Sequence, residues 1–112
     1  MSEEMPPTDD RIDTIRYVLT EHPQHCFTAD DIAEVVRFAR IPGPEGYADE
    51  ELMAVVRLGD GRFVAMEGWC DTTGWDCRSG LDATLHDSEE DAWLNGIGTD
   101  ARATIEREEQ GA

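Results

Sequence analysis

The sequence contains no lysine, few aromatic residues and little positive charge. All nine basic side chains are arginine, against 26 Asp and Glu residues, so the formal net charge is −17, and only 7% of the residues are aromatic. Such a charge repels phosphate backbones and anionic lipid, and the arginines are scattered instead of forming a stripe. The composition argues against direct binding to nucleic acid and against binding to a membrane surface.

Long hydrophobic runs are missing as well. No apolar stretch approaches the roughly 18 residues that span a bilayer, and residues 1–7 lack the basic flank and apolar run of a signal peptide. We therefore expect a cytoplasmic protein. Thiols stay reduced in the cytosol, so Cys26, Cys70 and Cys77 are expected as free thiols or ligands and not as a disulfide framework.

The chain length limits the number of domains. A chain of 112 residues buries one hydrophobic core and is too short for two. Acidic residues gather at the N-terminus, where the first ten positions hold four carboxylates and no cation. We predict a flexible acidic tail over residues 1–8, a single domain over 9–105 and a second flexible tail over 106–112.

Two helices are predicted before the middle of the chain. In the first, over about residues 9–21, the apolar side chains recur at helical intervals on one face. In the second, Thr28 and Asp31 have the spacing of a capping box, while Phe27 and Ile32 stand where a hydrophobic staple would close. Apolar residues continue at helical spacing to Ala39, and a Pro-Gly-Pro sequence then stops this predicted helix.

The middle of the chain predicts an antiparallel sheet. Asp60-Gly61 separates two apolar, β-favouring runs, which is a strong hairpin signal, so residues 53–58 are expected to pair with 62–69. A third strand is expected over residues 82–86. Ser88 followed by Asp91 indicates a helix start, so a short acidic helix should follow over 89–94 and end at Asn95-Gly96. A last helical segment is expected over 100–107.

The predicted fold class is therefore α+β, with two N-terminal helices packed on a small antiparallel sheet and a short acidic C-terminal helix after it. The order helix, helix, hairpin resembles a winged helix. However, the position of a DNA-recognition helix holds Asp49, Glu50 and Glu51 instead of cations. A winged-helix order would therefore serve protein binding.

The most distinctive segment is Gly68 to Gly80, with the sequence G-W-C-D-T-T-G-W-D-C-R-S-G. It resembles the C-D-x-T-G-W-D-C-x-S-G motif that follows a β-hairpin in small actinobacterial and actinophage proteins of no established activity. The resemblance covers about residues 54–102. It implies a shared fold segment and a lineage among actinobacteria or their phages, and it implies no reaction.

Three hypotheses assign a chemical role to this segment. Cys70 and Cys77 would ligate zinc together with Cys26 and a histidine, but neither a C-x-x-C nor an H-x3-5-H spacing is present. Asp71 and Asp76 would hold a hard cation, but the loop lacks the ligand spacing of an EF-hand.

In the third hypothesis, Cys70 is a nucleophile and His86 is its base. However, no helix N-terminus is placed to lower the pKa of the thiol. The simplest reading is structural, with Cys70 and Cys77 as half-buried side chains that face each other near the strand ends. We therefore predict no catalytic residue, no metal and no cofactor.

The sequence thus favours a non-enzymatic, acidic protein-interaction module. Its candidate interaction loop consists of Trp69, Asp71, Trp75 and Asp76, and its partner is expected to be a host or regulatory protein. The alternative is mimicry of DNA phosphates by the acidic runs, which would inhibit an enzyme that binds nucleic acid.

Overall fold

The computed structural model describes residues 10–42, 49–71 and 73–111. Its elements are α1 (Asp10–Glu21), the 3-10 turn η1 (Ala29–Asp31), β1 (Ile32–Pro42), β2 (Glu50–Leu58), β3 (Phe63–Asp71), β4 (Gly74–His86), α2 (Glu89–Asp91), the π-helical turn η2 (Ala92–Gly96) and α3 (Thr99–Gly111). The strands form one antiparallel sheet in the order β1-β2-β3-β4. The predicted α+β class with an antiparallel sheet is confirmed.

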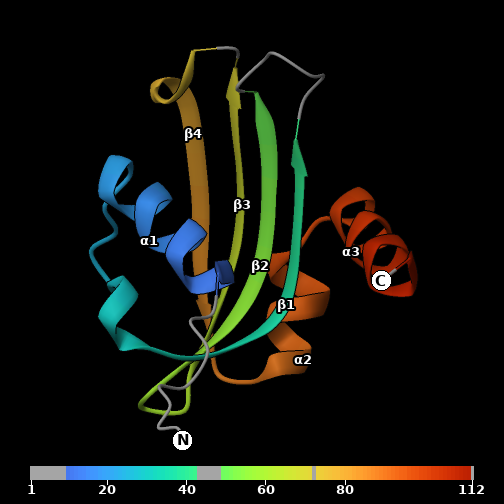
Figure 1. Cartoon of the computed structure of the whole chain (residues 1–112). Helices are drawn as coiled ribbons and strands as arrows, with labels where there is room; N and C mark the ends of the chain where they lie inside the picture. Colours follow the sequence, from blue (N-terminus) through green and yellow to red (C-terminus); the bar gives the residue numbers. More distant parts are fainter. Residues whose placement is uncertain (1–9, 43–48, 72, 112) are drawn as a thin grey trace, which may run out of the picture.

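The sheet carries a hydrophobic layer on each face, as the alternation along β2 shows. Leu52, Ala54 and Val56 belong to the cluster on the α1 face, and Met53 and Val55 belong to the cluster on the α3 face. All five are buried because β2 is an inner strand covered on both sides. Figure 1 shows α1 and α3 on opposite sides of the sheet.

Helix α1 agrees with its predicted bounds within one residue. Ile15, Val18 and Leu19 form its buried stripe and belong to the hydrophobic cluster on this face of the sheet. The predicted spacing of apolar residues therefore identifies both the helix and the side that it buries.

The second predicted helix is wrong. The Asp31 carboxylate accepts a hydrogen bond from the Thr28 backbone N–H at 2.8 Å, as the capping signal requires. The capping signal nevertheless begins only the single turn η1, after which the chain continues as the strand β1. The predicted pair of N-terminal helices and the winged-helix order are therefore replaced by one helix followed by a four-stranded meander.

Two β-bulges explain why the apolar residues of β1 have a spacing typical of a helix. The register shifts between Ile32 and Glu34 and again between Val35 and Arg37, so the simple alternation of a strand is broken. Val35 joins the cluster on the α1 face and Ala39 joins the cluster on the α3 face. Apolar residues that suggest one helical stripe are in fact divided between two faces of a sheet.

The predicted hairpin is confirmed. Strands β2 and β3 pair from Glu50↔Cys70 to Arg57↔Phe63. Leu58 N–H donates to the Arg62 carbonyl at 2.8 Å, and Gly61 has φ +93°, a left-handed conformation that glycine adopts without steric cost.

The C-terminal third also follows its local signals. The Ser88 hydroxyl accepts a hydrogen bond from the Asp91 N–H, and the helical turns α2 and η2 end at Gly96, as predicted. Strand β4 is longer than the predicted 82–86. Helix α3 continues to Gly111, so residues 106–111 are helical where the sequence predicts a tail.

The predicted tail over residues 1–8 lies outside the described residues. Within the described part of the chain, none of the helices has the length and apolar character required to cross a membrane.

Candidate interaction surface

The two tryptophans of the predicted interaction loop lie on opposite faces of the sheet. Trp69 is 50% exposed, whereas Trp75 is 5% exposed and belongs to the core cluster on the α1 face. The register explains the difference, because Asp71 pairs with Gly74 while Cys70 already pairs with Ser79, so residues 75–78 bulge out of β4. The structure thus separates two residues that the sequence groups into one loop.

Trp75 is part of the core. A Cβ atom at Gly68 would lie 3.0 Å from its Cη2, so only glycine allows the indole to pack so closely on β3. The imidazole of His22 meets the indole edge to face, with ring centroids 6.3 Å apart. The Ser79 hydroxyl lies 2.6 Å from His22 Nε2 and donates to the Trp75 carbonyl at 2.6 Å, which holds the bulge against α1.

Asp71 stabilises the turn that precedes the bulge. Its Oδ1 accepts hydrogen bonds from the Thr73 N–H at 2.9 Å and from the Thr73 hydroxyl at 2.5 Å. These bonds, with a smaller contribution from Arg78, lower the pKa of the Asp71 carboxyl. The side chain of Asp76 lies outside the described part, so its predicted role stays a prediction.

Trp69 lies across the strand pair on the α3 face. Its cross-strand neighbour on β4 is Gly80, and a Cβ atom there would lie 3.0 Å from Trp69 Nε1. The indole therefore extends over the backbone of β4, which a side chain at Gly80 would prevent. Trp69 is the only residue of the predicted loop that the described structure presents as a large exposed aromatic surface.

Carboxylates border this indole. Glu51 is the neighbour of Trp69 on β2, and Glu67 and Asp82 face each other one step along β3 and β4 on the same face. We refer to Trp69, Glu51, Glu67 and Asp82 as the Trp69 surface. Sequence reasoning noted Glu51 only as part of an acidic run and did not place the three carboxylates beside Trp69, because they come from three strands whose full register it did not predict.

A hollow of about 380 Å³ adjoins the Trp69 surface. It is lined by Ala65, Glu67, Asp82, Ala83, Thr84 and Gly96. Glu67 Oε2 accepts a hydrogen bond from the Gly98 N–H at 2.8 Å, which fixes one wall. Because Glu67 and Asp82 line it and no cation does, the hollow favours a positively charged group.

The arginines leave this surface uncompensated because they are engaged elsewhere. The side chains of six of them pair with carboxylates within 4 Å: Arg16–Asp30, Arg37–Glu109, Arg40–Glu50, Arg57–Glu34, Arg62–Asp60 and Arg78–Asp71. The guanidinium of Arg102 donates to the carbonyls of Trp93, Leu94 and Ile97 at the end of η2. Among residues 10–42, 49–71 and 73–111, no ion pair reaches Glu51, Glu67 or Asp82.

The predicted thiol and imidazole pair does not form. Cys70 is buried on the α1 face near the start of β2, and burial raises the pKa of its thiol. His86 pairs with Phe63 at the opposite end of β3 and on the α3 face. Cys70 therefore lies far from His86, and its raised pKa is the opposite of what a nucleophilic thiol needs.

Zinc ligands are likewise not assembled in the described structure. Cys26 lines a surface hollow beside Leu58 and Gly59, at the other end of β2 from Cys70. Within the described residues, no three His, Cys, Asp or Glu side chains are grouped to hold a metal ion. The side chain of Cys77 is not among those described, so its predicted contact with Cys70 stays a prediction.

His86 instead takes part in a hydrogen-bond chain. Its Nδ1 lies 2.5 Å from Asp91 Oδ2, and its Nε2 lies 2.7 Å from Thr84 Oγ1. The order carboxylate, imidazole, hydroxyl is that of a nucleophilic triad. Gly96 packs against the imidazole, where an added Cβ would lie 2.6 Å from His86 Nε2. The chain therefore fastens α2 and η2 to the sheet.

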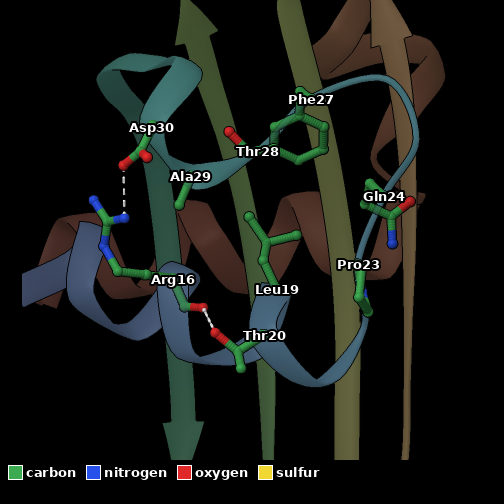
Figure 2. A pocket seen from close by; sticks show the side chains of 9 residues that line it. All are labelled: Arg16, Leu19, Thr20, Pro23, Gln24, Phe27, Thr28, Ala29 and Asp30. Atoms are coloured by element: carbon green, nitrogen blue, oxygen red, sulfur yellow. Dashed lines mark hydrogen bonds and ion pairs between the residues drawn. The ribbon is translucent and has the colours of Figure 1, made fainter.

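Figure 2 shows another hollow, of about 210 Å³, between α1 and η1. The Arg16 guanidinium donates to Asp30 Oδ1 at 2.8 Å across it, and the buried side chains of Leu19, Phe27 and Ala29 line it. Its residues are part of the packing of α1, and we assign no ligand to it.

Comparison of the chain with protein-family models, with curated proteins and with solved structures gives no match in any of the three.

Proposed function

We propose that the chain is a non-enzymatic protein-interaction module that binds a positively charged segment of a host or regulatory protein through the Trp69 surface. One observation carries the proposal: a half-exposed indole stands among carboxylates that have no ion-pair partner in the described structure. Indoles dominate the binding energy of many protein interfaces, and their faces attract Lys and Arg side chains.

The charge of the whole chain supports the same partner. A net charge of −17 steers a basic segment toward the protein over distances greater than any single contact. The burial of Cys70 supports a role in binding instead of catalysis at this thiol.

A defined peptide tests the proposal. The probe is a fluorescent peptide of about eight residues in which arginine and valine alternate, titrated into the full-length protein. We expect saturable binding that weakens as salt approaches about 0.15 M, where the Debye length is about 8 Å, mainly through a slower association rate. A peptide with glutamate in place of arginine should not bind.

Matched variants locate the binding surface. Trp69→Ala should raise the Kd about tenfold or more through faster dissociation, because it removes an interface anchor. Tyr17→Ala is the control, since Tyr17 is also 50% exposed but belongs to α1 on the other face. Equal effects of the two substitutions, or no binding of the arginine peptide, would contradict the proposal.

DNA mimicry is the second candidate, and the internal pairing of the arginines favours it because the excess negative charge is left at the surface. A mimic acts through spaced carboxylates and does not need an indole. It should bind a lysine-rich DNA-binding protein, such as a histone, equally well with Trp69→Ala, and duplex DNA should compete for the same site. If saturating duplex DNA leaves that complex intact, mimicry is wrong.

A further inference from the structure

The two edges of the sheet differ in their readiness to accept another strand. Edge strand β1 contains two bulges, ends at Pro42, which has no N–H to donate, and carries the cations Arg37 and Arg40. Bulges, proline and charge are the features that protect an edge from pairing.

Edge strand β4 has fewer of these protections between Ser79 and His86, where Asp82 is the only Asp, Glu, Lys or Arg. Its pairing with β3 is regular over this stretch, and the stretch contains neither proline nor a cation. In an antiparallel pair, every second residue turns its N–H and C=O away from the partner strand. For the described residues, the backbone hydrogen bonds made outside helices and strands include none to residues 79–86. The outer side of β4 thus presents a row of backbone donors and acceptors.

The side chains along this edge define what would pair there. On the α3 face, the indole of Trp69 extends over Gly80 toward the edge, and Asp82 follows it on the same face. On the α1 face, Leu81 and Leu85 are only partly buried against the core cluster. A segment lying along β4 would meet an anionic, aromatic strip on one side and an apolar strip on the other.

We propose that the partner's segment binds as a fifth strand along β4, with basic side chains toward Trp69 and Asp82 and apolar side chains toward Leu81 and Leu85. This inference rests on the proposed function and adds its mode of recognition, in which backbone hydrogen bonds supply affinity and alternate side chains supply specificity. A second copy of this chain is a poor occupant, because each copy carries a charge of −17 and antiparallel pairing of two β4 strands would bring the Asp82 carboxylates close together.

Amide exchange of the full-length protein tests this mode with the same arginine–valine peptide. At saturation, every second backbone amide between Ser79 and His86 should exchange about tenfold more slowly or better, while the amides between them change little. If the peptide binds and these amides show no alternating protection, strand addition is wrong and the proposed function stands. If the peptide does not bind at all, both are wrong.

Methylation of the peptide backbone gives an independent readout. Two peptides are compared, each N-methylated at one of the two alternating sets of valine or arginine residues. One of them should lose about tenfold or more in affinity because its inward N–H groups are blocked, and the other should stay within about twofold. Equal Kd values for both methylated peptides would overturn strand addition.

Charge reversal on the protein completes the test. Asp82→Lys should weaken binding of the unmethylated peptide about tenfold or more, since lysine on an edge strand both repels cations and discourages pairing. Asp13→Lys makes the same change of charge on α1 and should alter the Kd about twofold or less. A smaller effect of Asp82→Lys than of Asp13→Lys would place the peptide elsewhere.

Discussion

Trp69 and Trp75 each follow a glycine in the same short segment, yet the first is half exposed and the second is buried. Trp75 lies where α1, the bulge of β4 and the inner strands close over it. Trp69 lies on the other face, beyond the part of the sheet that α3 and η2 cover. The same residue type therefore stabilises the fold on one face and offers a binding surface on the other.

The comparison shows that the two roles depend on whether neighbouring elements bury the side chain, and not on the residue type. Both indoles pack on a glycine of the neighbouring strand, Trp75 on Gly68 and Trp69 on Gly80. The free energy of burial is gained in full only where other side chains remove the ring from water. Substitutions on the two faces should therefore differ in what they damage.

The largest expected effect comes from Trp75→Ala. Removing a buried indole leaves a cavity among Gly68, Leu81 and His22, which should lower the free energy of unfolding by about 3–5 kcal/mol. Trp69→Ala should change it by less than about 1 kcal/mol, because the indole is half exposed. Urea denaturation followed by circular dichroism measures both. Similar losses for the two variants would remove the distinction between the faces.

A smaller effect is expected from Gly96→Ala, which tests the covered part of the α3 face. The added methyl group would lie 2.4 Å from the Ala65 Cβ, so η2 must shift away from β3 at a cost of about 1–3 kcal/mol. Gly59→Ala is the control, since its nearest atom is the Asp31 carbonyl oxygen at 3.9 Å, an ordinary contact. An unchanged melting temperature for Gly96→Ala would show that η2 is loosely held.

The smallest effect concerns the Asp91 carboxylate. Hydrogen bonds from His86 and then from Asn95 lower the pKa of this group. A carboxyl whose pKa falls on folding stabilises the fold above its unfolded value of about 3.9, and this contribution is lost as the pH falls through the lower folded value. Asp91→Asn should therefore be less stable than the parent protein at neutral pH.

The gap in unfolding free energy between Asp91→Asn and the parent protein should close as the pH drops below about 3.9. Denaturation at a series of pH values measures this gap. Asp87→Asn removes the same charge from an exposed neighbour and is the control for the change in net charge. A gap that does not change with pH would show that the lowered pKa of Asp91 does not contribute to the stability of the fold.

Features that depend on a few neighbouring residues were predictable from the sequence. The apolar stripe of α1, the Asp60-Gly61 turn and the Ser88 cap each act within a few residues, and each stands where predicted. The strand β1 was not predictable, because bulges relative to β2 decide which side chains face which layer. Its capping signal at Thr28 is genuine but lasts for one turn.

The candidate surface was predictable in part. The two tryptophans stood out by composition, but the bulge after Gly74 decides that only Trp69 stays exposed, and that bulge depends on pairing with β3. Glu51 and Asp82 are separated in the sequence by a whole hairpin and meet Trp69 only through the register of three strands. Single-sequence patterns do not fix that register.

The meander has a consequence for the order of folding. Every strand of the sheet pairs only with strands adjacent to it in the chain, so the sheet can form by successive closure of short loops, each at a small entropic cost. Helix α3 makes contacts across most of the sequence, such as the pair Arg37–Glu109, which are 72 residues apart, so we expect it to dock after the sheet has formed. The docking of α3 completes the domain. The position of α3 also determines that the part of the sheet around Trp69 stays exposed.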